Sequence, residues 1–343
     1  MSEETLQSAP QTYPWESLPD EQLLELRFCE LKLQLSPELQ KAVAQLHAEL
    51  AHHGLLFKPG CYLGDEWFCP DGFPIISVPF YLAHPRLKQL ERKMMLETEG
   101  SGFEQCMCLL RHEAGHAINY AYFLHRKKKW RELFGPFSAP YEGTYKPRPY
   151  SKQYVRHLED WYAQYHPDED FAETFAVWLA PNSNWRELYQ GWGALKKLEY
   201  VDELIKSLKD KMPVNQRVKR ICDVSLMRSK LKTHYERKRH ALAHDLPDFY
   251  DQDLRRIFCE AEGELPAQKF LSKQKNFIIS SVARWTGEPK FMINRFMSNL
   301  KQRCTELNLK ACREEKQLAI EVASYLTMLT MNYRSTGRFT RVP

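Results

Sequence analysis

The segment from His112 to His116 constrains this chain more than any other feature. It reads His-Glu-Ala-Gly-His, so the two histidines are four residues apart and share one face of a helix. Both imidazoles can then reach one metal ion, and Glu113 between them points toward a water bound to that ion. The pattern is typical of the active-site helix of zinc hydrolases.

The residues around this motif predict a buried amphipathic helix. Ser101 followed by Glu104 has the spacing of a capping box, which predicts the start of the helix. Apolar residues then recur at helical spacing through the motif and beyond it. They are Phe103, Met107, Leu110, Ala114, Ala117, Ile118 and Ala121.

A second segment offers the remaining ligand, because a catalytic zinc needs three protein ligands and one open position. Pro167 suits the first residue of a helix, and acidic residues 168–170 fill its first turn. Glu169 and Glu173 are one turn apart on one face of this helix. One carboxylate can bind zinc while the other accepts the outward N–H of a ligand histidine. Alternatively, the acidic start only neutralises the helix dipole.

These residues resemble those of known metallopeptidases. A His-Glu-x-x-His helix followed by a helical Glu-x-Phe-Ala is similar to the gluzincins, in which that glutamate is the third ligand. The resemblance implies Glu169 as the zinc ligand, with Glu173 orienting a ligand histidine from outside the coordination sphere.

A closer resemblance is to the bacterial family described as "putative zinc-binding metallopeptidases". It rests on residues 111–116 and 166–176, extends over about residues 15–205, and includes residues 66–68, 79–82 and 134–136. Many members begin with a cysteine-rich zinc ribbon. No such ribbon is found in this sequence, so its role is not carried over.

The composition fits a folded cytoplasmic protein. Hydrophobic residues make up 43% of the 343 residues, and no apolar stretch is long enough to span a membrane. The N-terminus is acidic and polar, unlike a signal peptide. Nine scattered cysteines, an odd number, favour reduced thiols that act as small apolar residues. We therefore expect a cytoplasmic protein without membrane contact.

Charge divides the chain into two parts. Residues 1–212 carry 24 Lys and Arg against 30 Asp and Glu, whereas residues 213–343 carry 25 against 14. We predict a disordered N-terminus over residues 1–14, a zincin-like metallopeptidase domain over residues 15–212, and a basic helical domain over residues 213–343. The predicted fold class is α+β and mainly helical, with a small sheet, an active-site helix and a helical C-terminal extension.

The small sheet is expected before the active-site helix. Residues 62–68 and 75–82 are predicted strands, joined by a Pro-Asp-Gly turn at residues 70–72. Pro79 in the second strand favours an edge position. A free edge strand of this kind can bind an extended peptide substrate.

The predicted chemistry is peptide hydrolysis with one zinc per chain. Zinc lowers the pKa of its bound water to about 7, and Glu113 is the expected general base. The oxyanion needs a further donor, for which Tyr162 is the first candidate and His157 and Tyr165 are rivals. The expected partner is a peptide or protein substrate.

Two other classes of function stay open. A metal-binding interaction protein without turnover would keep His112, His116 and Glu169 but would not need Glu113. A nucleic-acid-associated protein would use the basic C-terminal part, for example residues 230–240, and is the less favoured alternative. The sequence does not predict the physiological substrate, endo- or exopeptidase preference, the oligomeric state or the role of the C-terminal helices.

Overall fold

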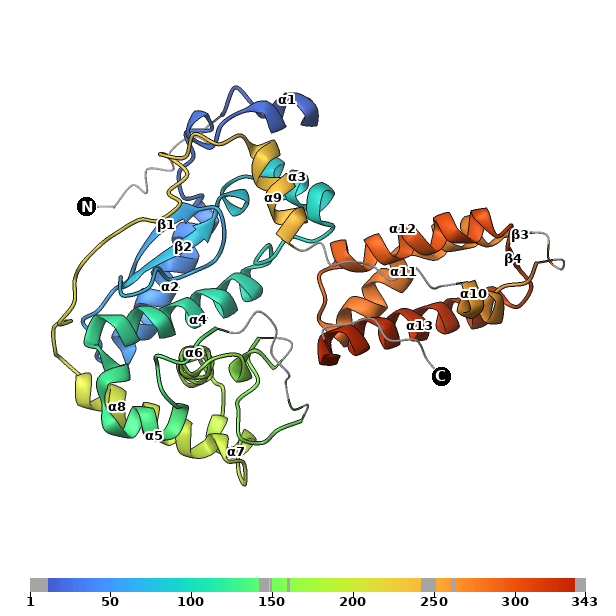
Figure 1. Cartoon of the computed structure of the whole chain (residues 1–343). Helices are drawn as coiled ribbons and strands as arrows, with labels where there is room; N and C mark the ends of the chain where they lie inside the picture. The colour runs from blue at the N-terminus through green and yellow to red at the C-terminus, as the bar shows by residue number, and fades with distance from the viewer. Residues whose placement is uncertain are drawn as a thin grey trace.

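The computed structural model describes residues 12–141, 148, 150–158, 161–241, 251–260, 263 and 265–336. Most of the predicted disordered N-terminus, residues 1–11, lies outside the described residues. Figure 1 shows a larger body and, beside it, a bundle of long helices formed by the C-terminal part of the chain. The buried apolar side chains form two clusters, one for each of these parts. The first lies within residues 15–235 and the second within residues 254–329.

The larger body is mainly helical. Its described α-helices are α1 (Asp20–Glu25), α2 (Pro37–His52), α3 (Pro85–Met95), α4 (Phe103–Tyr122), α5 (Lys128–Phe134), α6 (Pro167–Leu179), α7 (Trp185–Leu188), α8 (Ala194–Leu208) and α9 (Leu231–Ala241). Short 3-10 helices lie at Phe28–Glu30, Phe80–Ala83, Leu124–Arg126 and Tyr162–Gln164. The predicted fold class, a mainly helical α+β zincin-like domain with a helical extension, is confirmed.

The sheet of the larger body differs from the prediction. Strands β1 (Gly60–Gly64) and β2 (Ile75–Pro79) pair in parallel. On the other side of β2, Ser77 forms an antiparallel bridge with Phe68, and all five β2 residues are buried. The expectation that this strand is a free edge for substrate is therefore wrong, because the chain itself covers both sides. The predicted strand is also too long, since residues after Pro79 form a 3-10 helix.

Helices α4 and α6 approach each other closely at Gly115. A Cβ atom at this position would lie 2.7 Å from the Cα atom of Ala172 and 3.0 Å from its carbonyl oxygen. Both are backbone atoms of α6, so no side-chain rotation could make room, and glycine is what permits this spacing. The capping box predicted at Ser101 is absent, because Gly102 is the N-cap and has no capping side chain.

We expect Gly115→Ala to lower the free energy of unfolding by about 1–3 kcal/mol, the usual cost of overpacking. The added methyl group would push α4 away from α6. Gly102→Ala is the matched control, because a Cβ there meets nothing within 4 Å. Urea unfolding followed by circular dichroism measures both variants. Equal stability of the Gly115 variant and the wild type would contradict the close packing of the two helices.

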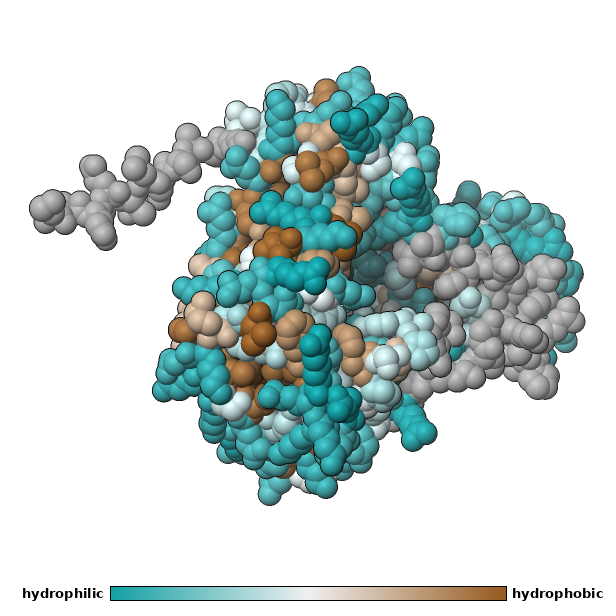
Figure 2. Space-filling view, turned by 60° about the vertical axis from the view of Figure 1, so that its left-hand side comes forward, coloured by the Kyte–Doolittle hydropathy of each residue, from teal (hydrophilic) through white to brown (hydrophobic). Residues whose placement is uncertain are grey.

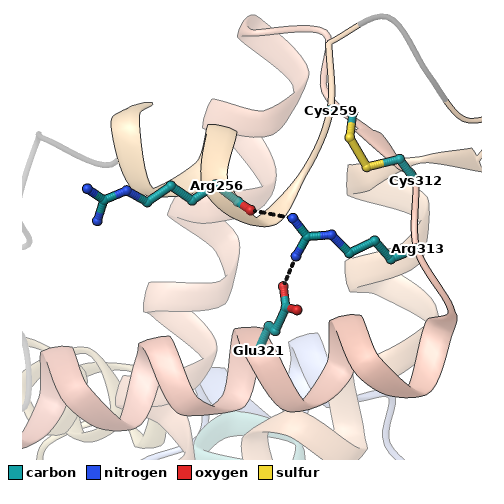
Figure 3. The surroundings of a disulfide bond; sticks show 5 residues. All are labelled: Arg256, Cys259, Cys312, Arg313 and Glu321. Atoms are coloured by element: carbon teal, nitrogen blue, oxygen red, sulfur yellow. Dashed lines mark hydrogen bonds and ion pairs between the residues drawn. A yellow bond between two sulfur atoms is a disulfide. The ribbon is translucent and has the colours of Figure 1, made fainter.

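The C-terminal bundle contains α10 (Asp251–Ile257), α11 (Ala267–Thr286), α12 (Lys290–Glu306) and α13 (Glu315–Thr336). The two short strands β3 (Leu265–Pro266) and β4 (Lys310–Ala311) pair antiparallel at one end of the bundle. A disulfide links Cys259 to Cys312. Beside it, Arg313 pairs with Glu321 and donates to the carbonyl oxygen of Arg256 (Figure 3). The expectation that all cysteines are reduced is wrong for the two that form this bond.

The division predicted between residues 212 and 213 stays a prediction. Several residues beyond it pack with the larger body: Val224, Leu231 and Tyr235 belong to its core, and the hydroxyl of Tyr62 donates to the carbonyl oxygen of Ile221 at 2.7 Å. We therefore propose that the division lies later, between α9 and α10.

The surface of the larger body is mostly hydrophilic, but apolar patches interrupt it on the face shown in Figure 2. Among the described helices, none combines the length and the apolar character that a membrane crossing requires.

Candidate metal centre

Helices α4 and α6 bring His112, His116 and Glu169 together in the interior of the larger body. All three side chains are buried. The two Nε2 atoms lie 3.2 Å apart, and the Oε2 atom of Glu169 lies 3.1 Å from the Nε2 atom of His112 and 3.2 Å from that of His116. Among the described residues, this is the group whose ligand atoms are arranged to hold a metal ion.

The spacing of these three atoms fits zinc. Zinc binds histidine nitrogen and carboxylate oxygen at about 2.0–2.2 Å with tetrahedral geometry, which places neighbouring ligand atoms about 3.3 Å apart. The observed triangle is nearly equilateral and only slightly smaller. Three protein ligands would leave the fourth tetrahedral position open, as in catalytic rather than structural zinc sites.

The outward nitrogens of both histidines bind carboxylates. The Nδ1–H of His112 donates to Glu173 at 2.7 Å, and the Nδ1–H of His116 donates to Asp168 at 2.9 Å. With the protons on Nδ1, each neutral ring presents a bare lone pair at Nε2. In this neutral state, which zinc binding requires, the two lone pairs and the carboxylate of Glu169 face one another without a proton between them. A cation at their centre removes the resulting repulsion.

Glu173 contacts the ring of His112 on the side away from the three facing ligand atoms. Its Oε1 atom accepts from His112, and its Oε2 atom accepts the backbone N–H of Leu158 at 2.9 Å. The carboxylate is thus fixed by α6 and by the segment before it. It holds the ring of His112 in one orientation and one tautomer.

Asp168 has the same relation to His116, and the sequence analysis missed it. The carboxylate accepts hydrogen bonds from His116, from Asn119 Nδ2 at 2.7 Å and from the hydroxyl of Tyr120 at 2.8 Å. The two extra donors follow His116 by three and four residues, so they lie on the same face of α4. That spacing was a usable signal, but an acidic residue in a first helical turn is commonly explained by the helix dipole.

We expect Asp168→Asn to weaken zinc affinity by about 10- to 100-fold, the usual size of a loss next to a ligand histidine. The amide keeps the volume of the side chain. However, the amide has no negative charge, and its NH2 group would face one of the three groups that donate to Asp168. Competition with a chromogenic chelator measures the affinity. Asp210→Asn, the same chemical change at an exposed position just after α8, is the control. Unchanged affinity in the Asp168 variant would show that the ring of His116 is oriented by other contacts.

Glu113 lies beside the metal triangle as a buried carboxylate. Its Oε2 atom has no hydrogen-bond partner within the described structure. Burial raises the pKa of Glu113, although the nearby His112 and His116 act to lower it. A buried unpartnered carboxylate oxygen is costly unless something polar meets it. A water molecule at the open position of a metal ion would be such a partner.

The electrostatics of the centre favour a cation. Burial alone would lower the pKa of His112, but hydrogen bonds to Glu169 and Glu173 raise it to about 9. Burial would raise the pKa of Glu169, but the two histidines hold it well below its usual range. Asp168 and Glu113 add two more buried carboxylates to the same small volume. The surplus of negative groups fits a divalent ion.

The oxyanion candidates occupy different places. The ring of Tyr162 lies 5.7 Å from the ring of His112, and within the described residues its hydroxyl makes no hydrogen bond. His157 instead binds Cys108 on α4, with its Nε2 atom 2.9 Å from that residue's carbonyl oxygen. Tyr165 packs against the ring of Tyr162 at 5.8 Å. Of these three contacts, the one made by Tyr162 is with a histidine of the metal triangle.

Tyr141 is a site residue that the sequence analysis did not single out. Its hydroxyl donates to the Oε1 atom of Glu169 at 3.1 Å, and its ring stacks on His166 at 3.9 Å. Tyr141 begins a Pro- and Tyr-rich segment of the sequence, residues 141–150, of which residues 142–147 and 149 lie outside the described residues.

The candidate metal centre thus consists of two histidines on one helix and a carboxylate on a second helix packed against it. Residues 88–227 match the model of the family described as "Putative zinc-binding metallo-peptidase". The matched region contains α4, α6 and all residues of the centre, so the resemblance found in the sequence is confirmed. Searches of curated proteins and of solved structures give no significant match.

Proposed function

We propose that this protein is a zinc-dependent metallopeptidase that hydrolyses peptide bonds. One zinc ion per chain would be held by His112, His116 and Glu169. The observation that carries the proposal is the close triangle of three facing lone pairs beside the unpartnered carboxylate of Glu113. The family match agrees with the coarser statement, a zinc-binding peptidase.

The proposed reaction assigns a separate task to each side chain. A bound zinc ion would activate a water molecule and polarise the peptide carbonyl. Glu113 accepts the proton of the attacking water and returns it to the nitrogen of the leaving amine. Its burial excludes bulk water from the oxygen that carries this proton. Glu173 and Asp168 hold the rings of His112 and His116 in place.

Two tyrosines complete the proposed site. The hydroxyl of Tyr162, which has no hydrogen-bond partner among the described residues, is our candidate donor to the oxyanion that forms on the substrate carbonyl. Tyr141 is a positioning residue, because its hydrogen bond to Oε1 leaves Oε2 of Glu169 directed at the histidines. A Tyr162→Phe variant would then lose turnover while keeping its zinc.

The alternative of a metal-binding protein without turnover is supported less well. Such a protein needs the three ligands but gains nothing from Glu113, whose buried oxygen lacks a partner. The cytoplasmic location also stays a prediction. The disulfide between Cys259 and Cys312 removes the cysteine argument that favoured it.

Digestion of a library of unstructured peptides, read by mass spectrometry, tests the proposal. We expect cleavage by the zinc-loaded protein, loss of cleavage after treatment with a chelator, and recovery when zinc is restored. Cleavage that survives removal of the metal would come from another enzyme in the preparation. If the loaded protein cleaves no peptide, the interaction-protein alternative replaces this proposal.

A further inference from the structure

The C-terminal bundle carries an apolar groove between α11 and α13. Phe277 and Trp285 form one wall and come from α11, while Ile320 and Met328 form the other and come from α13. The smaller Ser281 lies between the two aromatic residues along α11. The groove has a volume of about 480 Å³ and is open to solvent.

The large side chains of the groove are exposed although the bundle already has a core. Trp285 is 76% exposed, Ile320 is 62% exposed and Phe277 is 55% exposed. The adjoining face of α11 buries Ile278 and Val282 in the second cluster, to which α13 also contributes residues. Each helix therefore has a second apolar face that the bundle does not cover. Contiguous exposed apolar surface of this kind is typical of interaction sites.

The charged residues of α11 all have one sign. This helix contains four basic residues and no acidic residue. Of these, Lys273 pairs with Glu315 of α13, whereas the described structure gives no ion pair to Lys269, Lys275 or Arg284. Helical spacing places Lys269 and Arg284 on one flank of the face formed by Phe277, Ser281 and Trp285, whereas Lys275 lies on the other side of the helix. A partner that approaches this flank would meet uncompensated positive charge.

We propose that this groove binds an amphipathic helix of a partner protein whose apolar stripe is flanked by acidic residues. The walls from Phe277 to Trp285 extend over two turns, about 12 Å at 1.5 Å per residue. Three apolar side chains at positions i, i+4 and i+8 of a partner helix span this length. Because the side chain of Ser281 is small, the backbone of the partner helix can come close to α11. Acidic residues on the flanks of the partner helix would then meet the cations of α11.

Two other occupants fit less well. A second copy of this chain would place the cations of α11 against the same cations, which costs energy. A single-stranded nucleic acid would use the cations and stack on Trp285, but it gains little from the aliphatic wall formed by Ile320 and Met328. The inference does not depend on the proposed peptidase activity, because it concerns binding alone.

A labelled synthetic peptide of roughly 18 residues tests the inference. It carries leucines at helical spacing and glutamates at the flanking positions, and a second peptide has lysines in place of the glutamates. The full chain with Glu113→Gln is used, so that the probe stays intact, and binding is followed by fluorescence anisotropy. Trp285→Ser combined with Ile320→Ser removes the walls, and Val218→Ser, which is 67% exposed elsewhere, is the control.

We expect saturable binding of the glutamate peptide, at least about tenfold weaker binding of the lysine peptide, and a loss of at least about tenfold in the groove variant but not in the control. Circular dichroism checks that the groove variant is folded. Three results would overturn the inference: equal binding of both peptides, insensitivity to the groove substitutions, and a groove-dependent dimer or oligonucleotide complex in place of peptide binding.

Discussion

Glu113→Gln is expected to keep the full zinc content and to lower peptide hydrolysis at least about 100-fold, because general-base catalysis contributes about 100- to 10,000-fold. The amide has the shape of the carboxylate but cannot accept a proton. Since Glu113 is not one of the three facing ligands, metal binding should survive. The melting temperature should not fall, because a neutral amide costs less to bury than the unpartnered carboxylate.

Zinc content by mass spectrometry and hydrolysis of the peptide library are measured on the same samples. Glu104→Gln is the matched control, since it makes the same chemical change at an exposed position of α4. The control should retain the activity of the wild type. Equal activity of the Glu113 variant would mean that this carboxylate is not the base, and would favour the non-enzymatic alternative.

Glu169→Ala is expected to abolish tight zinc binding, whereas Glu173→Ala should weaken it by about 10- to 100-fold. The two glutamates are one turn apart on α6, but only Glu169 points an oxygen at both inner nitrogens. Glu173 contacts the outer nitrogen of His112. Loss of a ligand leaves two histidines, which do not suffice for a catalytic zinc site.

Titration of the zinc-loaded proteins with a chelator ranks the two variants. Glu187→Ala, an exposed glutamate on the nearby α7, serves as a control that changes charge without touching the centre. A reversed order, with Glu173→Ala losing more zinc than Glu169→Ala, would make Glu173 the ligand. The ligand assignment would then be wrong by one helical turn.

The parts of the centre that depend on one helix were predictable from sequence. His112 and His116 share a face because they are four residues apart, whatever packs against them. Glu169 and Glu173 are related in the same way, so their division between ligand and support could be stated in advance as a prediction. Each of these inferences needs only the geometry of a single helix.

The parts that depend on contacts between distant segments were not predictable. The hydrogen bond between His116 and Asp168 requires one register of α6 against α4. The close contact between Gly115 and the backbone of Ala172 sets this register. The parallel pairing of β1 with β2 and the bridge at Phe68 likewise join segments that sequence spacing does not place side by side. Hydrophobic periodicity gives the faces of helices and strands, but not their partners.

The most direct test of the central claim is the zinc content of the purified protein after zinc supplementation and removal of loosely bound metal. The account predicts about one zinc per chain in the wild type. It predicts almost none after His112→Ala combined with His116→Ala, which removes two of the three facing ligand atoms. A wild-type protein without zinc, or a double variant that retains it, would contradict the account.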